Sequence, residues 1–205
     1  PDAAECLADR CGRCDAVLIG PGMLDDRTAA RLTAGLLRRC TANSTPFVLD
    51  AAALKSLLES DLLLQGSALA GRIVITPHSG EMAGLLGLSR EEVLADRLSA
   101  ARQAAAMFQV VVAMKGACTF IVTPDGSAWS CDRGNVGLAT SGSGDTLAGI
   151  VAGLLARGAT PLAATIWGVF LHSEAGDRLA RRKGPLGFLA RELLAEVPAL
   201  RDQAA

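Results

Sequence analysis

The chain has 205 residues, half of them hydrophobic, and its 20 basic and 21 acidic side chains give a formal net charge of −1. With two Trp, five Phe and no Tyr it has neither the basic surface nor the aromatic content typical of a nucleic-acid-binding protein, and no apolar run reaches the roughly 18 residues of a membrane helix. We therefore expect a single cytosolic domain over residues 1–205 that binds neither nucleic acid nor a membrane.

Short apolar stretches alternate with helical periodicity along the first half of the chain. The expected strands are residues 15–19, 46–49, 72–75 and 110–114. The expected helices are residues 27–40 and 54–59, one that begins near Gly80, and one with residues 98, 101, 105 and 108 on one face. This alternation predicts a layered domain built on a parallel sheet.

The second half begins with the pattern of a β-hairpin. Residues 119–123 and 128–131 form two strand-like runs, and Asp125-Gly126 supplies a tight turn between them. After Asp145, apolar side chains recur at helical spacing, and helices are expected from there to the C-terminus. These apolar residues are Leu147, Ile150, Val151, Leu154 and Leu155.

Glycines and polar side chains follow the ends of the expected parallel strands. Gly20-Pro21-Gly22 follows the first strand, Asp50 the second, Thr76-Pro77-His78 the third and Lys115-Gly116 the fourth. Open α/β sheets bind their ligands at this edge, so we expect the site there. Asp50 is interpreted either as a ligand or as a helix cap.

The segment Thr140–Asp145 contains two glycines, three hydroxyls and one carboxylate at the start of an expected helix. Free amides at a helix N-terminus attract phosphate, and glycines allow the backbone to approach it closely. Asp145 is then expected to face the reacting centre. The alternative is that Ser143 or Asp145 only caps the helix; a second glycine-rich stretch at residues 133–137 favours the anion site.

Two further segments carry candidate site residues. The run Lys115–Thr119 follows a buried strand, so the ammonium group is expected at the ligand edge; the alternative is a solvated lysine in a turn. His78 is expected to contact substrate, while Glu81 either holds water on a magnesium ion or only begins a helix. His172 falls within a helix, where we expect a buried structural role.

The cysteines indicate a reducing compartment. Cys11-Gly12-Arg13-Cys14 has the spacing of a redox or zinc pair, but no second pair follows it, so we expect neither function. The six cysteines are at positions 6, 11, 14, 40, 118 and 131.

Five segments occur in an order that is more specific than any one of them. They are residues 18–22, 48–51, 76–82, 114–119 and 134–145, within residues 16–175. Together they resemble the ADP- or ATP-dependent NAD(P)H-hydrate dehydratases of the ribokinase-like superfamily. A glycine-rich loop ending in Gly-Asp is shared by the superfamily, whereas its combination with Pro-His-x-Gly-Glu and Gly-Asn-x-Gly is much narrower.

The resemblance implies a ribokinase-like α/β/α fold with a mostly parallel central sheet and helices on both faces. It also implies a lyase that repairs hydrated NADH or NADPH: ADP or ATP phosphorylates the ring hydroxyl, and loss of phosphate restores the dihydronicotinamide. Asp145 is then the catalytic base, and Mg²⁺ bridges the phosphates through water near Glu81. A homo-oligomer such as a tetramer is expected.

The resemblance also divides the site residues between the two ligands. The expected nucleotide-binding residues are Lys115, Gly116, Ala117, Cys118, Thr119, Gly142, Ser143 and Gly144. The expected substrate-binding residues are Gly22, His78, Asn135 and Asp145.

The chain departs from the family pattern in three places. The N-terminal glycine-rich strand and helix region of the usual fold is missing, Asp50-Ala51-Ala52 stands where Asp-Ala-Asp is usual, and Ser79 stands where proline is common. Two alternatives therefore stay open. One is a ribokinase-like kinase of a thiazole or hydroxymethylpyrimidine alcohol, because the same phosphoryl transfer would stop before elimination. The other is a nucleotide-binding module without turnover.

Overall fold

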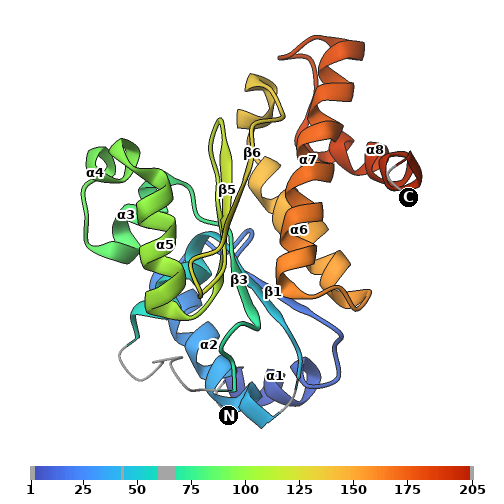
Figure 1. Ribbon diagram of the computed structural model, residues 1–205. Helices are drawn as coiled ribbons and strands as arrows, with labels where there is room; N and C mark the ends of the chain where they lie inside the picture. Colours follow the sequence, from blue (N-terminus) through green and yellow to red (C-terminus); the bar gives the residue numbers. More distant parts are fainter. Residues whose placement is uncertain (1–2, 43, 60–67, 204–205) are drawn as a thin grey trace.

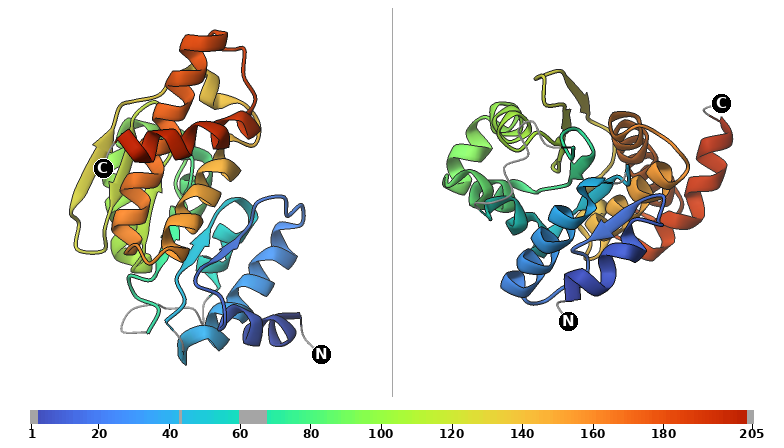
Figure 2. Two further views of the ribbon diagram at one scale, coloured as in Figure 1. Left: turned by 90° about the vertical axis from the view of Figure 1, so that its right-hand side faces the viewer. Right: turned by 90° about the horizontal axis from the view of Figure 1, so that it is seen from below.

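The computed structural model describes residues 3–42, 44–59 and 68–203, and Figures 1 and 2 show a sheet between two layers of helices. The six strands lie in sequence order across the sheet. The first four are parallel, and the last two add an antiparallel hairpin, as the sequence predicts. The strands are β1 (Val17–Ile19), β2 (Phe47–Leu49), β3 (Ile73–Ile75), β4 (Val111–Met114), β5 (Thr119–Val122) and β6 (Ala128–Cys131).

Helices of the N-terminal half cover one face of the sheet. The expected helices at 27–40 and near Gly80 are present, whereas the short helix expected at 54–59 is a 3₁₀ helix that starts at Ala51. These elements are α1 (Ala3–Cys11), α2 (Asp26–Arg39), η1 (Cys40–Ala42), η2 (Ala51–Leu58), α3 (Ser79–Leu86), α4 (Arg90–Ala95) and α5 (Arg97–Phe108). The helix α1 was not expected from the sequence; it packs against α2, where a Cβ on Gly35 would be 2.8 Å from the Cβ of Ala4.

Helices of the C-terminal half cover the other face, and α8 packs outside them (Figure 1). The helical elements of this half are η3 (Val136–Ala139), α6 (Ser143–Ala156), α7 (Pro161–Lys183) and α8 (Ala190–Gln203). Within the described ranges no helix combines the length and the apolar character needed to cross a bilayer.

Side-chain alternation along the strands builds a separate core on each face. In β2, Phe47 and Leu49 belong to the core beneath α1–α5, while Val48 belongs to the core beneath α6 and α7. In β3, Ile73 and Ile75 likewise belong to the core beneath α1–α5, and Val74 belongs to the core beneath α6 and α7. Because both faces are covered, every residue of these two strands is buried, which explains their continuous apolar runs.

The carboxyl ends of the parallel strands meet at one edge of the sheet. The Asp50 amide donates to the Ile19 carbonyl at 3.1 Å, and the Lys115 amide donates to the Pro77 carbonyl at 2.8 Å. Gly20 has a φ of +122°, and a Cβ there would be 1.7 Å from the Asp50 carbonyl oxygen. Only glycine fits at this position, so the turn after β1 packs directly on the backbone that carries Asp50.

Candidate functional site

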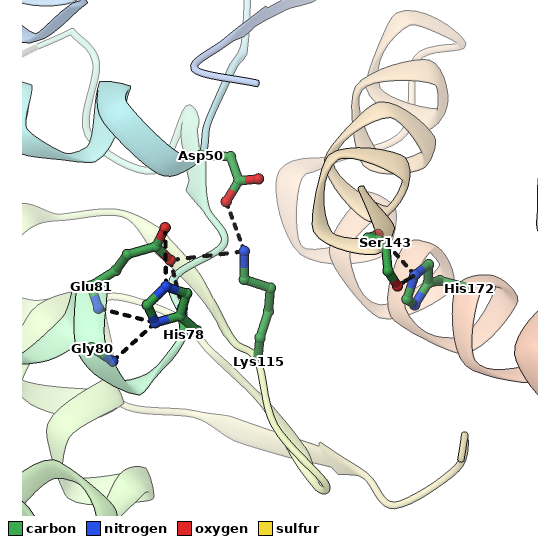
Figure 3. Close-up of polar contacts among 7 residues, drawn as sticks. All are labelled: Asp50, His78, Gly80, Glu81, Lys115, Ser143 and His172. Atoms are coloured by element: carbon green, nitrogen blue, oxygen red, sulfur yellow. Dashed lines mark hydrogen bonds and ion pairs between the residues drawn. The ribbon is translucent and has the colours of Figure 1, made fainter. Parts of the chain in front are cut away.

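An ion-pair network lies at the carboxyl ends of β2, β3 and β4. The ammonium nitrogen of Lys115 is 2.9 Å from Asp50 Oδ1 and 3.8 Å from Glu81 Oε2 (Figure 3). The Asp50 side chain is only 2% exposed, and that of Lys115 is 19% exposed. Interpreting Asp50 as a cap was wrong, because its side chain makes no cap hydrogen bond to η2. Interpreting Lys115 as a solvated turn residue was also wrong.

His78 and Glu81 form a reciprocal cap at the start of α3. The amides of Gly80 and Glu81 donate to His78 Nδ1 at 3.0 and 3.2 Å, and the His78 amide donates to Glu81 Oε2 at 2.8 Å. Since Nδ1 accepts, the neutral ring carries its proton on Nε2, which is 3.6 Å from Glu81 Oε1. Of the two roles left open for Glu81 by the sequence, the structure shows the one at the start of this helix, and the magnesium role stays a prediction.

The first turn of α6 faces this network from the other face of the sheet. Gly142 is the N-cap with a φ of +81°, and it provides no side-chain cap, so the simple-cap interpretation of Ser143 or Asp145 is wrong. A Cβ on Gly144 would lie 3.2 Å from Lys115 Nζ and 3.9 Å from Asp50 Oδ2. The helix therefore brings bare backbone close to the lysine.

Asp145 is the third residue of α6 and is exposed. It directly follows Gly144, but it is not among the residues that line the two clefts described below. Within the described ranges its carboxylate has no hydrogen-bond or ion-pair partner. The side chain is thus available to a bound molecule, outside the buried part of the site.

Two clefts flank the network. The first, named here the α6 cleft, has a volume of about 550 Å³. It is lined by residues 115–117, 119, 133–136, 138, 139, 143, 144, 147, 169, 172 and 173. The second, named the His78 cleft, has a volume of about 420 Å³. It is lined by residues 23, 26, 51, 52, 54, 55, 58, 78, 80, 81, 84 and 85.

Most of the predicted site residues line one or the other of the two clefts. Lys115, Gly116, Ala117, Thr119, Ser143 and Gly144 line the α6 cleft, whereas Cys118 and Gly142 do not. His78 and Glu81 line the other cleft. Asn135, predicted on the substrate side, lies in the α6 cleft, and Gly22 is exposed outside both.

Helix α7 supplies site contacts that the sequence did not reveal. Asp177 accepts from the Gly134 amide at 3.1 Å and from Asn135 Nδ2 at 3.0 Å, which fixes the loop along the α6 cleft. Asn135 in turn accepts from the Gly137 amide at 2.9 Å. The spacing of acidic residues on a helix indicates only a solvated face, so no sequence signal pointed to Asp177 as a loop anchor.

Arg97 supports the turn that follows β4. Its Nη2 donates to the Met114 carbonyl at 3.1 Å, and its guanidinium carbon lies 5.5 Å from the centre of the Phe120 ring. A Cβ on Gly116 would be 2.2 Å from Nη2, so any larger residue at this position would require the guanidinium to move from the turn.

His172 is buried, as expected for a structural histidine, with 8% of its surface exposed. Burial, with a smaller contribution from the charge of Lys115, lowers its pKa to about 4 despite the hydrogen bond to Ser143. The ring is therefore neutral in neutral solution.

The cysteines do not form a centre of their own. All six are free thiols, and burial raises the pKa of Cys11. Throughout the described segments, no group of three or more His, Cys, Asp or Glu side chains could hold a metal ion.

Comparison with known proteins places this geometry in context. A family model described as NAD(P)H-hydrate dehydratase matches residues 2–199. The chain is 46% identical over 192 residues to the ADP-dependent (S)-NAD(P)H-hydrate dehydratase of Xanthomonas campestris pv. campestris, which covers 93% of this chain and 62% of that protein. The chain thus spans less than two thirds of the length of that relative.

Solved structures agree on the fold. A ribokinase-like superfamily protein from Enterococcus faecalis has a TM-score of 0.83 and 28% identity, covering 98% of this chain and 67% of that one. The ADP/ATP-dependent NAD(P)H-hydrate dehydratase from Bacillus subtilis, co-crystallized with ATP/Mg²⁺, has a TM-score of 0.78 and 26% identity, covering 97% and 70%. The fold is ribokinase-like, as the sequence predicted.

Proposed function

Since this chain belongs to the NAD(P)H-hydrate dehydratase family, we propose that it dehydrates hydrated NADH or NADPH with ADP or ATP as the phosphoryl donor. The observation that carries the proposal is the position of Lys115. It lines the α6 cleft, touches Glu81 of the His78 cleft and lies beside the first turn of α6. Two ligands that exchange a phosphoryl group need two adjoining clefts with positive charge between them.

The α6 cleft is the proposed nucleotide side. Its polar end combines the Lys115 ammonium with the backbone of Ser143 and Gly144, which suits phosphate, and Val136, Leu138 and Val169 give it apolar walls, which suit a purine ring. Asn135 belongs to this side in the proposal.

The His78 cleft is the proposed side of the nicotinamide hydrate. His78 lines this cleft, and the hydrogen on its Nε2 can be donated to a polar group of the substrate. Met23, Leu54 and Leu85 add apolar contacts for a ring. Gly22 lies in the same loop as Met23, and a ligand that extends past that side chain would reach it.

The proposal includes Mg²⁺, which would bind together with the nucleotide phosphates. The Lys115 ammonium already occupies the space between Asp50 and Glu81, so the residues do not form an all-protein cage. Mg²⁺ keeps most of its waters and favours phosphate oxygens, and the partly exposed Glu81 carboxylate fits contact through water. When bound, the ion would neutralise charge on the transferring group.

The proposed chemistry has two steps. The substrate hydroxyl oxygen bonds to the terminal phosphorus while the bond from phosphorus to the bridging oxygen breaks, and Asp145 takes the hydroxyl proton. The carbon–oxygen bond then breaks, so inorganic phosphate leaves with its electron pair and a proton leaves the neighbouring ring carbon. Backbone amides of Ser143 and Gly144 stabilise the charge on the phosphoryl oxygens in the first step.

A coupled assay tests the proposal. The protein is incubated with hydrated NADH, magnesium and either ADP or ATP, and dihydronicotinamide absorbance and inorganic phosphate are followed together. Both should rise in equal amounts. A stable phosphomonoester of an alcohol substrate would instead show a kinase, and nucleotide binding without turnover would show a binding module.

The proposal includes a cytosolic homo-oligomer such as a tetramer. The six free thiols suit a reducing compartment. Sedimentation equilibrium measures the assembly, and a monomer at micromolar concentration would contradict that part of the proposal.

A further inference from the structure

A buried histidine from α7 holds the first residue of α6. His172 Nε2 is 3.0 Å from both the hydroxyl oxygen and the carbonyl oxygen of Ser143 (Figure 3). Both residues are buried, with 8% and 3% of their surfaces exposed, and both line the α6 cleft. Twenty-nine residues of chain separate them, so the contact ties two helices together at the cleft wall.

The two distances assign the protons. A carbonyl oxygen can only accept, so a 3.0 Å contact to it requires a hydrogen on Nε2. That hydrogen is shared with the Ser143 hydroxyl oxygen, which therefore also accepts. The hydroxyl hydrogen of Ser143 is then left to donate to another group.

The start of α6 needs such an external support. Its N-cap Gly142 gives no side-chain hydrogen bond, and Gly144 follows in the first turn. Glycines lose the most backbone entropy on folding, so this turn is intrinsically weak. The Ser143 carbonyl is the helical acceptor of the Leu147 amide, and the imidazole occupies its second lone pair.

We propose that His172 is a positioning residue: it fixes the first turn of α6 and leaves the Ser143 hydroxyl hydrogen free to donate to a phosphate oxygen in the α6 cleft. The phosphate part rests on the proposed function. The imidazole stays neutral, so it serves as a fixed donor and adds no charge to the cleft.

The test compares four variants. His172→Gln keeps an amide nitrogen near the Nε2 position, whereas His172→Asn places it near Nδ1 and His172→Leu removes it. Leu171→Ala is the matched control: it opens the adjacent buried position, in the core shared by α6, α7 and α8, without changing the imidazole.

Two readouts are measured on each variant. The first is hydrogen–deuterium exchange of the Thr146 and Leu147 amides without ligand. The second is the affinity for ADP with magnesium, by calorimetry. In His172→Leu and His172→Asn we expect faster exchange and about tenfold weaker ADP binding. A tenfold loss of affinity corresponds to the loss of one hydrogen bond to a charged group. His172→Gln should remain within about threefold of wild type, as should Leu171→Ala.

The outcomes distinguish a failure of the role of His172 from a failure of the proposed function. Wild-type exchange and affinity in His172→Leu and His172→Asn would overturn the role of His172. If His172→Leu does not fold, the comparison of the Gln and Asn variants decides the same question. If the wild-type protein binds neither ADP nor ATP, the proposed function fails, and exchange at Thr146 and Leu147 still decides whether His172 fixes the helix.

Discussion

Lys115 and Asp50 form a 2.9 Å ion pair across 65 residues of sequence, with the carboxylate almost wholly buried. Removing one partner of such a pair leaves an uncompensated buried charge, which typically costs about 3–5 kcal/mol. Lys115→Ala should therefore lower the free energy of unfolding by several kcal/mol and weaken nucleotide binding, measured by urea unfolding and calorimetry. In the double variant with Asp50→Asn, stability should largely return while affinity stays low. Full recovery of affinity in the double variant would contradict a direct contact between Lys115 and the nucleotide.

Asp145→Asn should reduce kcat on the order of 10²–10⁴-fold, because it removes the proposed proton acceptor at nearly constant shape. Nucleotide affinity should stay unchanged. Asp132→Asn is a suitable control, since Asp132 is another exposed carboxylate and lies outside both clefts. Equal kcat in the two variants would eliminate Asp145 as the base.

Gly144→Ala should weaken nucleotide binding by about tenfold, because its methyl group would lie 3.2 Å from Lys115 Nζ, where we propose that phosphate binds. The fold should persist, since Lys115 can shift by a few tenths of an ångström. Gly149→Ala is the control on the same helix, because a Cβ there meets nothing within 4 Å. It should stabilise the protein by about 0.5–1 kcal/mol without changing affinity. Equal nucleotide affinity in the two variants would contradict phosphate binding beside Gly144.

Stability should decrease as the pH falls from 6.5 to 4 because of His172. Its pKa is about 4 in the folded protein, below the ordinary value of 6.5, so in this window the unfolded chain binds a proton that the folded protein does not. The shift corresponds to about 3 kcal/mol, present above pH 6.5 and lost by pH 4. Thermal unfolding across this range should show a smaller loss in His172→Gln. Parallel curves for the two proteins would show that other groups cause the decrease.

The sheet and its functional edge could be predicted from sequence because their signals are local. Apolar runs such as Val110–Met114 can only be buried strands or helix cores, and the glycines and polar residues after them mark the strand ends. The turn Asp125-Gly126 similarly fixes the hairpin. The helix α1 lacked such a signal; of its alanines only Ala4 is buried, and it packs against Gly35 of α2.

The partners within the site depend on tertiary structure and could not be predicted. The sequence singled out Lys115 and His78, but not that Asp50 pairs with the lysine or that Glu81 and His78 cap each other. The resemblance assigned Asn135 to the substrate, and nothing local in the sequence shows that Asp177 of α7 fixes its loop along the α6 cleft. These pairings follow from how the helices cross the sheet.

Lys115 lines the α6 cleft and also contacts Glu81, which lines the His78 cleft. A molecule bound in either cleft would therefore interact with the same ammonium group. Its charge would change the electrostatic potential in the other cleft. Thermodynamic linkage makes this influence mutual: the factor by which one compound alters the affinity of the second is the factor by which the second alters the first. Under the proposed function, neither saturation curve is then a property of one compound alone, and each shifts with the concentration of the other.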